Sequence, residues 1–164
     1  MQKNCKLQKL GEIKLMNNKI LIFGATGAVG SALAKLFVDN KNDCHLIGKN
    51  NEDVSRLAEE TGYTYSTADV LEDNFLDKIE QDLNNAEISG IAYCIGSIDL
   101  KPINLISKKD VMKSFSLNLF PIYEIVKKFQ PSLKKNKGSI VLFSTVAVRQ
   151  GFPNHCIISP AKAS

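Results

Sequence analysis

The sequence has no tryptophan, and its four cysteines form no recognisable metal or redox motif. Cys5, Cys44, Cys94 and Cys156 lie far apart in the chain. Zinc sites and redox dithiols need cysteines a few residues apart, so this spacing argues against both, and we expect no metal site. Isolated thiols are typical of a reducing compartment, and we therefore expect the protein to be cytoplasmic.

Long hydrophobic runs are also missing. The most apolar stretches, residues 20–23 and 140–148, are much shorter than the roughly 20 residues that a helix needs to cross a bilayer. Neither follows the charged and apolar pattern of a secretory signal. We therefore expect no membrane association.

The chain has little excess of either charge: 21 lysines and arginines stand against 17 acidic residues, a net charge of +4. Most of that excess lies before residue 20, where no aromatic side chain separates the lysines and no nucleic-acid motif follows. We therefore expect no nucleic-acid partner. Residues 1–18 show no periodicity and are expected to form a mobile extension, with Met16 as an alternative start; residues 19–164 are expected to form one domain.

What the sequence does contain, from Lys19 onward, is a regular alternation of short apolar runs and longer amphipathic stretches. This alternation is typical of βαβ units and predicts an α/β fold, a doubly wound parallel sheet of the Rossmann type with about five strands. The expected strands are 20–23, 44–47, 64–67, 90–94 and 139–143. The expected helices are 28–40, 51–61, 72–84 and 108–134.

A glycine-rich loop joins the first strand to the first helix. Gly24 would make the tight turn, and Gly30 would allow close contact between helix and strand. Backbone N–H groups at such a helix N-terminus suit the pyrophosphate of a dinucleotide. A glycine-rich turn with no ligand is the alternative. The candidate cofactor contacts of the loop are Gly24, Thr26, Gly27, Ala28, Val29 and Gly30.

The end of the second strand carries Lys49, where many NAD enzymes have an acidic residue. A lysine can neutralise a 2′-phosphate, so the sequence favours NADP(H) over NAD(H); a solvated loop lysine is the alternative. Asp69, after the third strand, could accept a hydrogen bond from adenine or cap the following helix.

From Lys19 to Ser164 these residues resemble the short-chain dehydrogenase/reductase family. Gly24 and Gly30 match the family's glycine loop, although Ala28 stands where its middle glycine is usual. Asp69 and Val70 are similar to the acidic pair that holds adenine. Gly96 matches the glycine of the family's Asn-Ala-Gly, which here reads Cys94-Ile95-Gly96. The resemblance implies a dinucleotide site made by these residues.

The resemblance also implies catalytic residues. Asn118 matches the asparagine of the family's long helix, and Lys162 matches the lysine of its Tyr-x-x-x-Lys pair, where it also holds the nicotinamide ribose. Thr145 falls on the position of the family's serine, with Ser144 beside it. The implied activity is oxidation of an alcohol or reduction of a carbonyl in a small molecule.

Ile158 occupies the place of the family's tyrosine. In the family that tyrosine is the general acid, and isoleucine has no proton to give. His155 is an alternative donor, because its ordinary pKa suits acid–base work near neutrality. Tyr93 is expected in the strand core and Tyr123 on the packed face of a helix. The hydroxyl of Thr145 could polarise a carbonyl or simply end a strand.

Family members continue beyond this lysine, whereas this chain stops at Ser164. We therefore expect a C-terminally incomplete domain, with a last helix of about two turns and an uncovered fifth strand. The long helix 108–134 is expected to form a homo-oligomer interface. Two further hypotheses remain: a nucleotide-binding module or dimer partner without turnover, and a methyltransferase that uses S-adenosylmethionine on a similar sheet.

Overall fold

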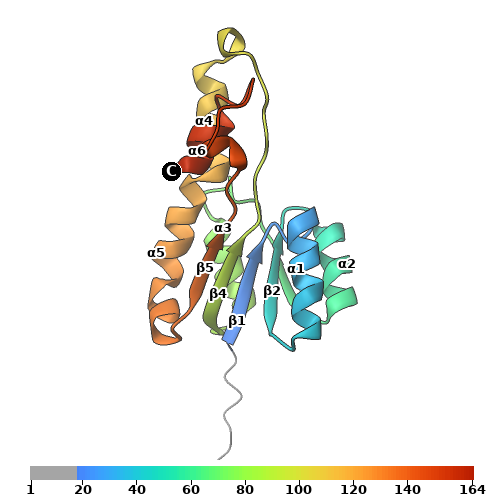
Figure 1. Ribbon diagram of the computed structural model, residues 1–164. Coiled ribbons are helices and arrows are strands. Elements are labelled where there is room, and N and C mark those ends of the chain that lie inside the picture. The colour runs from blue at the N-terminus through green and yellow to red at the C-terminus, as the bar shows by residue number, and fades with distance from the viewer. Residues whose placement is uncertain (1–17) are drawn as a thin grey trace, which may run out of the picture.

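A computed structural model describes residues 18–164, which form one parallel sheet with helices on both faces (Figure 1). The mobile extension was predicted for residues 1–18 and the alternative start at Met16. Residues 1–17 lie outside the described part of the chain, and Asn18 begins the first strand. The sheet order is β3-β2-β1-β4-β5. The strands are β1 (Asn18–Phe23), β2 (Cys44–Gly48), β3 (Thr64–Thr67), β4 (Glu87–Tyr93) and β5 (Ser139–Leu142). The helices are α1 (Ala28–Asp39), α2 (Asn51–Thr61), α3 (Phe75–Leu83), α4 (Lys108–Asn118), α5 (Phe120–Lys135) and α6 (Ile158–Ala163), with short 3-10 turns η1 (Ile103–Leu105) and η2 (Val146–Val148).

The central strand β1 shows why the sheet is wound on both sides. Leu21 and Phe23 pack into one core, together with α3 and α5, and Ile22 packs into the other, together with α1 and α2. Successive side chains of a strand point to opposite faces, so a run of apolar residues requires cover on both. The predicted doubly wound Rossmann-type fold is confirmed.

The predicted helix 108–134 is two helices in the structure. α4 begins at a capping box, in which Ser107 and Asp110 exchange hydrogen bonds, and it ends at Asn118. Leu119 has φ −129° and ψ −56°, and Pro121 follows in the first turn of α5. Proline has no N–H and its ring clashes with the carbonyl one turn earlier, which explains the break.

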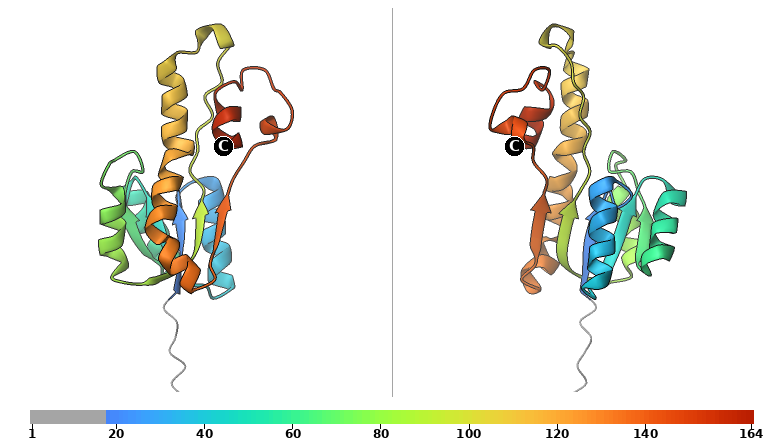
Figure 2. Two further views of the ribbon diagram at one scale, coloured as in Figure 1. Left: turned by 90° about the vertical axis from the view of Figure 1, so that its left-hand side faces the viewer. Right: turned by 45° about the vertical axis from the view of Figure 1, so that its right-hand side comes forward.

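The helix α4 and the chain that leads to it stand above the carboxyl ends of the strands (Figure 2). The segment after β4 rises alongside α4, and Lys101 N–H donates to the carbonyl of Asn154 at 3.2 Å. This hydrogen bond joins the two loops that follow β4 and β5. Together with α6, these elements form a wall around the end of the sheet where nucleotide-binding α/β proteins hold their ligands.

The strand β5 lies at an edge of the sheet and pairs with β4. Its apolar side chains are exposed, with Val141 at 50% and Leu142 at 52%. The uncovered fifth strand expected from the sequence is present, although it ends one residue before Phe143. In residues 18–164, no helix combines the length and the apolar character needed to span a membrane.

Candidate functional site

The glycine loop between β1 and α1 makes the turn that the sequence predicts. Gly24 has φ +73°, a conformation that favours glycine, and its N–H donates to the carbonyl of Ile47 at 2.9 Å. A Cβ atom on Gly30 would lie only 2.3 Å from the carbonyl oxygen of Gly24. Glycine at position 30 is therefore required for α1 to approach the loop.

The first turn of α1 presents backbone N–H groups without a side-chain cap. Gly27 is the N-cap residue, its side chain offers no acceptor, and the first turn holds no acidic residue. The N–H groups of Ala28, Val29 and Gly30 therefore have no partner within the helix. Such a helix end attracts an anion, because its N–H groups and the helix dipole both favour negative charge.

A cleft of about 450 Å³ opens beside this loop, at the carboxyl ends of the strands. It brings together most of the residues predicted to bind a cofactor, while Ala28, Val29, Gly30 and Lys162 lie outside its lining. The predicted residues in the lining are Gly24, Thr26, Gly27, Lys49, Asp69, Val70 and Gly96. Further lining residues that the sequence did not single out include Leu71, Cys94, Ser97, Lys113 and Leu117.

At the β2 end of the cleft, Gly48 takes the position just before Lys49. A Cβ atom on Gly48 would lie 3.2 Å from Cβ of Val54 and 3.3 Å from Cγ2 of Thr26, so a larger residue would crowd this corner. Lys49 is exposed and belongs to none of the ion pairs formed among residues 18–164. Its ammonium group is available to an anionic ligand.

Asp69 lines the cleft but does not cap a helix. Its carboxylate accepts the N–H of Leu71 at 3.0 Å and so closes a tight turn. The helix α3 begins later, at Phe75, with Asn74 as its N-cap residue, rather than at Glu72 as the sequence suggested. The helix-capping alternative for Asp69 is therefore wrong, because the turn separates it from α3.

Asn118 and Lys162 meet at Gly96. A Cβ atom on Gly96 would lie 3.0 Å from Asn118 Oδ1 and 3.0 Å from Lys162 Nζ, so glycine leaves the space that lets all three converge. Lys162 Nζ donates to the carbonyl of Ile95 at 3.3 Å, and burial lowers the pKa of this lysine. Two elements distant in sequence, α4 and α6, thus deliver polar groups to Gly96 at the edge of the cleft, where Asn118 and Lys162 line a second cavity of about 250 Å³.

The carboxamide oxygen of Asn118 is a buried acceptor without a hydrogen-bond partner among the described residues. The Asn118 side chain is 2% exposed, and its Nδ2 is satisfied by the carbonyl of Ser114 at 2.9 Å. A buried polar atom left unpaired costs free energy. This oxygen is therefore suited to accept a hydrogen bond from water or a ligand.

Ser144 and Thr145 follow β5 and differ in what their hydroxyls do. Ser144 Oγ donates to the carbonyl of Lys162 at 3.1 Å, which ties the end of β5 to α6. Thr145 Oγ1 accepts the N–H of Ala147 at 3.3 Å and caps the turn η2. Since the Thr145 hydroxyl acts as an acceptor there, its own proton remains free to donate.

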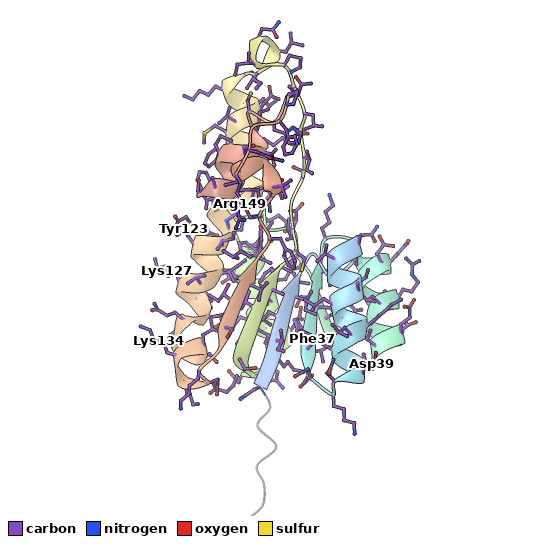
Figure 3. The ribbon with its side chains drawn as sticks, viewed as in Figure 1. Phe37, Asp39, Tyr123, Lys127, Lys134 and Arg149 are labelled. Atoms are coloured by element: carbon purple, nitrogen blue, oxygen red, sulfur yellow. The ribbon has the colours of Figure 1, made fainter. Side chains whose placement is uncertain are left out.

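Ile158 stands at the first position of α6 and is 2% exposed. Tyr93 is buried in the strand core as expected, and burial raises the pKa of its phenol. Tyr123 (labelled in Figure 3), in contrast, is 66% exposed and lines a cavity shared with Asn118 and Lys162, so its predicted place on a packed face is wrong. The buried positions of α5 are Pro121, Ile125, Phe129 and Leu133, and residue 123 falls off that stripe.

His155 holds a defined orientation. Its Nδ1 donates to the carbonyl of Pro153 at 2.8 Å, and its ring lies against Phe152 with 5.5 Å between ring centroids. The carbonyl can only accept, so Nδ1 carries the proton and Nε2 of the neutral ring is an acceptor. His155 is not among the cleft-lining residues.

Cys94 lines the cleft where the family has asparagine. Its side chain is partly buried, and this burial raises the pKa of the thiol to about 11. The thiol is therefore protonated near neutral pH and is a poor nucleophile.

A parallel, doubly wound sheet with a glycine loop at its first βα turn and a cleft at the strand ends defines a Rossmann-type nucleotide-binding fold. A family model described as short chain dehydrogenase matches residues 18–164. The chain therefore belongs to the short-chain dehydrogenase family.

Two relatives are longer than this chain. YIR035C, an uncharacterized oxidoreductase of Saccharomyces cerevisiae, is 26% identical over 91% of this chain and 61% of its own length. The 3-oxoacyl-(acyl-carrier-protein) reductase FabG of Chlamydia trachomatis is 23% identical over 91% of this chain and 64% of its own length. The chain thus spans about three fifths of the length of these relatives.

Solved structures share the fold. The crystal structure of YIR035C matches with a TM-score of 0.83 at 21% identity, covering 89% of this chain and 60% of the other. The KRED1-Pglu enzyme matches with a TM-score of 0.83 at 18% identity, covering 89% and 64%. At these identities the likeness concerns the fold alone.

Proposed function

We propose that this protein binds NADP(H) in the cleft beside the glycine loop and transfers hydride between it and a small molecule that is a carbonyl or the corresponding alcohol. The observation that carries the proposal is the position of Gly96, which lines the cleft and also adjoins Asn118 and Lys162. One residue thus links the nucleotide-binding part of the cleft to the two polar groups that suit catalysis. The FabG relative is named as a reductase of 3-oxoacyl groups, which supports a carbonyl as the hydride acceptor.

The residues present fit a phosphorylated dinucleotide. Unpartnered N–H groups at the start of α1 suit the pyrophosphate. Lys49 supports a 2′-phosphate, because a cation stands where a carboxylate would repel it. Asp69 and Val70 support binding of adenine at the third strand end.

A bound cofactor would supply the hydride, and the side chains of this chain have separate tasks. Lys162 is an ammonium group at the rim of the cleft and can donate to ribose hydroxyls. Thr145 has a hydroxyl proton free to polarise a carbonyl oxygen, whereas the proton of Ser144 is committed to the carbonyl of Lys162. We therefore assign polarisation of the substrate to Thr145 and a positioning role to Ser144.

Proton donation to the carbonyl oxygen is the step of the proposed reaction for which the chain is least well equipped. A positioned general acid contributes about 10²–10⁴-fold to a rate. Ile158 cannot supply it, and His155 can donate from Nε2 only as the imidazolium ion. We therefore expect slow carbonyl reduction with cofactor binding intact.

The experiment that tests the function follows NADPH binding and consumption in purified protein. Binding is read from NADPH fluorescence and turnover from loss of its absorbance with a panel of aldehydes and ketones. We expect binding, and slow consumption that disappears in Lys162→Ala. Binding without consumption of any substrate would favour the module without turnover. Binding of S-adenosylmethionine in place of NADPH would contradict the proposal.

The cofactor preference has its own test at Lys49. Lys49→Gln should weaken NADPH binding by about fivefold, the equivalent of one exposed ionic contact, and leave NADH binding unchanged. Arg56→Gln is a matched control, because Arg56 is exposed on α2 and already pairs with Asp53. Equal affinity for NADPH and NADH in the unmodified protein would contradict the preference for NADP(H).

We also propose a homo-oligomer formed through the long helical segment of α4 and α5, and a reducing compartment for the protein. Phe120 and Tyr123 are 44% and 66% exposed on α5, which supports contact with another apolar surface. The described cysteines are free thiols, which supports the compartment. Light scattering would test the assembly: we expect a dimer or larger, and a smaller species for Tyr123→Asp. A monomeric unmodified protein would contradict it.

A further inference from the structure

Lys113 lies on the helical wall of the cleft. It belongs to α4 and lines the same cavity as Gly24, Gly27 and Lys49. Leu117, one helical turn further on, lines the cavity too. Residues one turn apart share a face of a helix, so this face of α4 is turned toward the cleft.

The helix α4 is capped at its start and tied to the sheet at its end. At its start, the Ser107 hydroxyl accepts the N–H of Asp110 at 3.2 Å and closes the capping box. At its end, the phenol of Tyr93 donates to the carbonyl of Leu117 at 2.6 Å. Lys113 thus projects from a helix that is held to the sheet, not from a free loop.

The charge of Lys113 is not neutralised by any ion pair among residues 18–164. The nearest acidic residue of its own helix, Asp110, is bound to Lys101 at 2.6 Å and to the Ser107 hydroxyl at 2.7 Å. The charged residues of the cleft lining are Lys49, Lys113 and Asp69, which leaves an excess of positive charge.

We propose that Lys113 is a second cationic contact for a phosphate group of the dinucleotide, made from the α4 wall while the glycine loop and Lys49 act from the strand ends. The inference rests on the proposed function, because it concerns the same cleft. An ammonium group with three donors and no ion-pair partner in the described part of the chain is suited to a phosphate oxygen. The α4 wall would then take part in binding the cofactor as well as supplying Asn118 to the rim of the cleft.

Binding of NADPH and NADH to four proteins tests this role: the unmodified chain, Lys113→Gln, Lys113→Arg and Lys108→Gln. Lys108 is the matched control, because it is an exposed lysine of α4 outside the cleft lining. We expect Lys113→Gln to weaken NADPH binding by about fivefold and to reduce its dependence on salt. Lys113→Arg should retain the affinity, and Lys108→Gln should leave it unchanged.

The NADH measurement identifies the phosphate. An equal loss for NADH and NADPH assigns Lys113 to the pyrophosphate, and a loss confined to NADPH assigns it to the 2′-phosphate. If Lys113→Gln binds NADPH as tightly as Lys108→Gln does, the inference is overturned while the proposed function stands. If the unmodified protein binds neither nucleotide, the proposed function itself fails.

Discussion

The phenol of Tyr93 donates a 2.6 Å hydrogen bond to the carbonyl oxygen of Leu117, and so joins the end of β4 to the last turn of α4. In a continuous helix that carbonyl would accept the N–H of residue 121, but position 121 is proline. The break between α4 and α5 therefore leaves the Leu117 carbonyl without a backbone donor, and the buried phenol of Tyr93 donates to it instead. This contact holds the cleft wall that carries Lys113 against the sheet.

Replacing Tyr93 with phenylalanine should lower the free energy of unfolding by about 1–3 kcal/mol, since it leaves the Leu117 carbonyl without its donor. In a Pro121→Ala background the same substitution should cost less, because alanine restores an N–H at that position. Denaturant unfolding of the two single variants and the double variant measures this coupling. Additive effects would show that the proline does not create the free carbonyl.

Substitution at Gly30 tests the contact between α1 and the glycine loop. A Cβ atom there would lie 2.3 Å from the carbonyl oxygen of Gly24, so Gly30→Ala must displace backbone, at a cost of about 1–3 kcal/mol. We expect reduced stability and a loss of NADPH binding. Gly151→Ala is the control, since a Cβ atom at Gly151 meets nothing within 4 Å. Equal behaviour of the two variants would contradict the tight contact.

The parts of the fold and of the site that the sequence predicts are those determined by residues close together in the chain. The turn at Gly24 and the close approach at Gly30 depend on residues a few positions apart, so the glycine spacing predicts them. The predicted place of Tyr123 on a packed face is wrong, because the buried positions of α5 are 121, 125, 129 and 133 and residue 123 falls between them. The break between α4 and α5 is a separate difference from the single helix expected at residues 108–134, and Pro121 explains it.

Contacts between distant segments limit prediction of the site. Asn118 and Lys162 could be paired only through a family resemblance, since α4 and α6 meet at Gly96 in space and not in sequence. In the sequence, nothing distinguishes Lys113 among the 21 basic residues. It stands out only because the structure places its helix against the cleft.

His45 is a buried histidine that the proposed function does not use. It is fully buried in β2, and its ring nitrogens lie 2.8 Å from the hydroxyls of Thr64 and Ser66. Ser66 in turn donates to Asp82 at 2.6 Å. Burial, followed by the positive charge of Lys19, lowers the pKa of His45 from 6.5 to about 4, although Asp82 opposes this shift.

This depressed pKa predicts acid destabilisation. The neutral ring stabilises the fold fully above the unfolded pKa of 6.5, and that contribution is lost as the pH falls toward about 4. The loss should be about 3 kcal/mol across this window. Unfolding by denaturant from pH 7.5 to 4 measures it. His45→Gln should flatten the slope; an unchanged slope in His45→Gln would place the acid sensitivity elsewhere.

The absent proton donor gives the sharpest prediction about turnover. Ile158→Tyr puts a phenol at the position that the family resemblance assigns to the general acid, in the same helix as Lys162. If hydride transfer is otherwise intact, carbonyl reduction should rise by about 10²–10⁴-fold, with little change in NADPH affinity. Ile158→Phe is the matched control, because it adds a similar ring to this buried position without the hydroxyl, and the rise should disappear when Lys162→Ala is added. A folded Ile158→Tyr variant that binds NADPH but reduces carbonyls no faster would mean that the missing acid does not limit the rate.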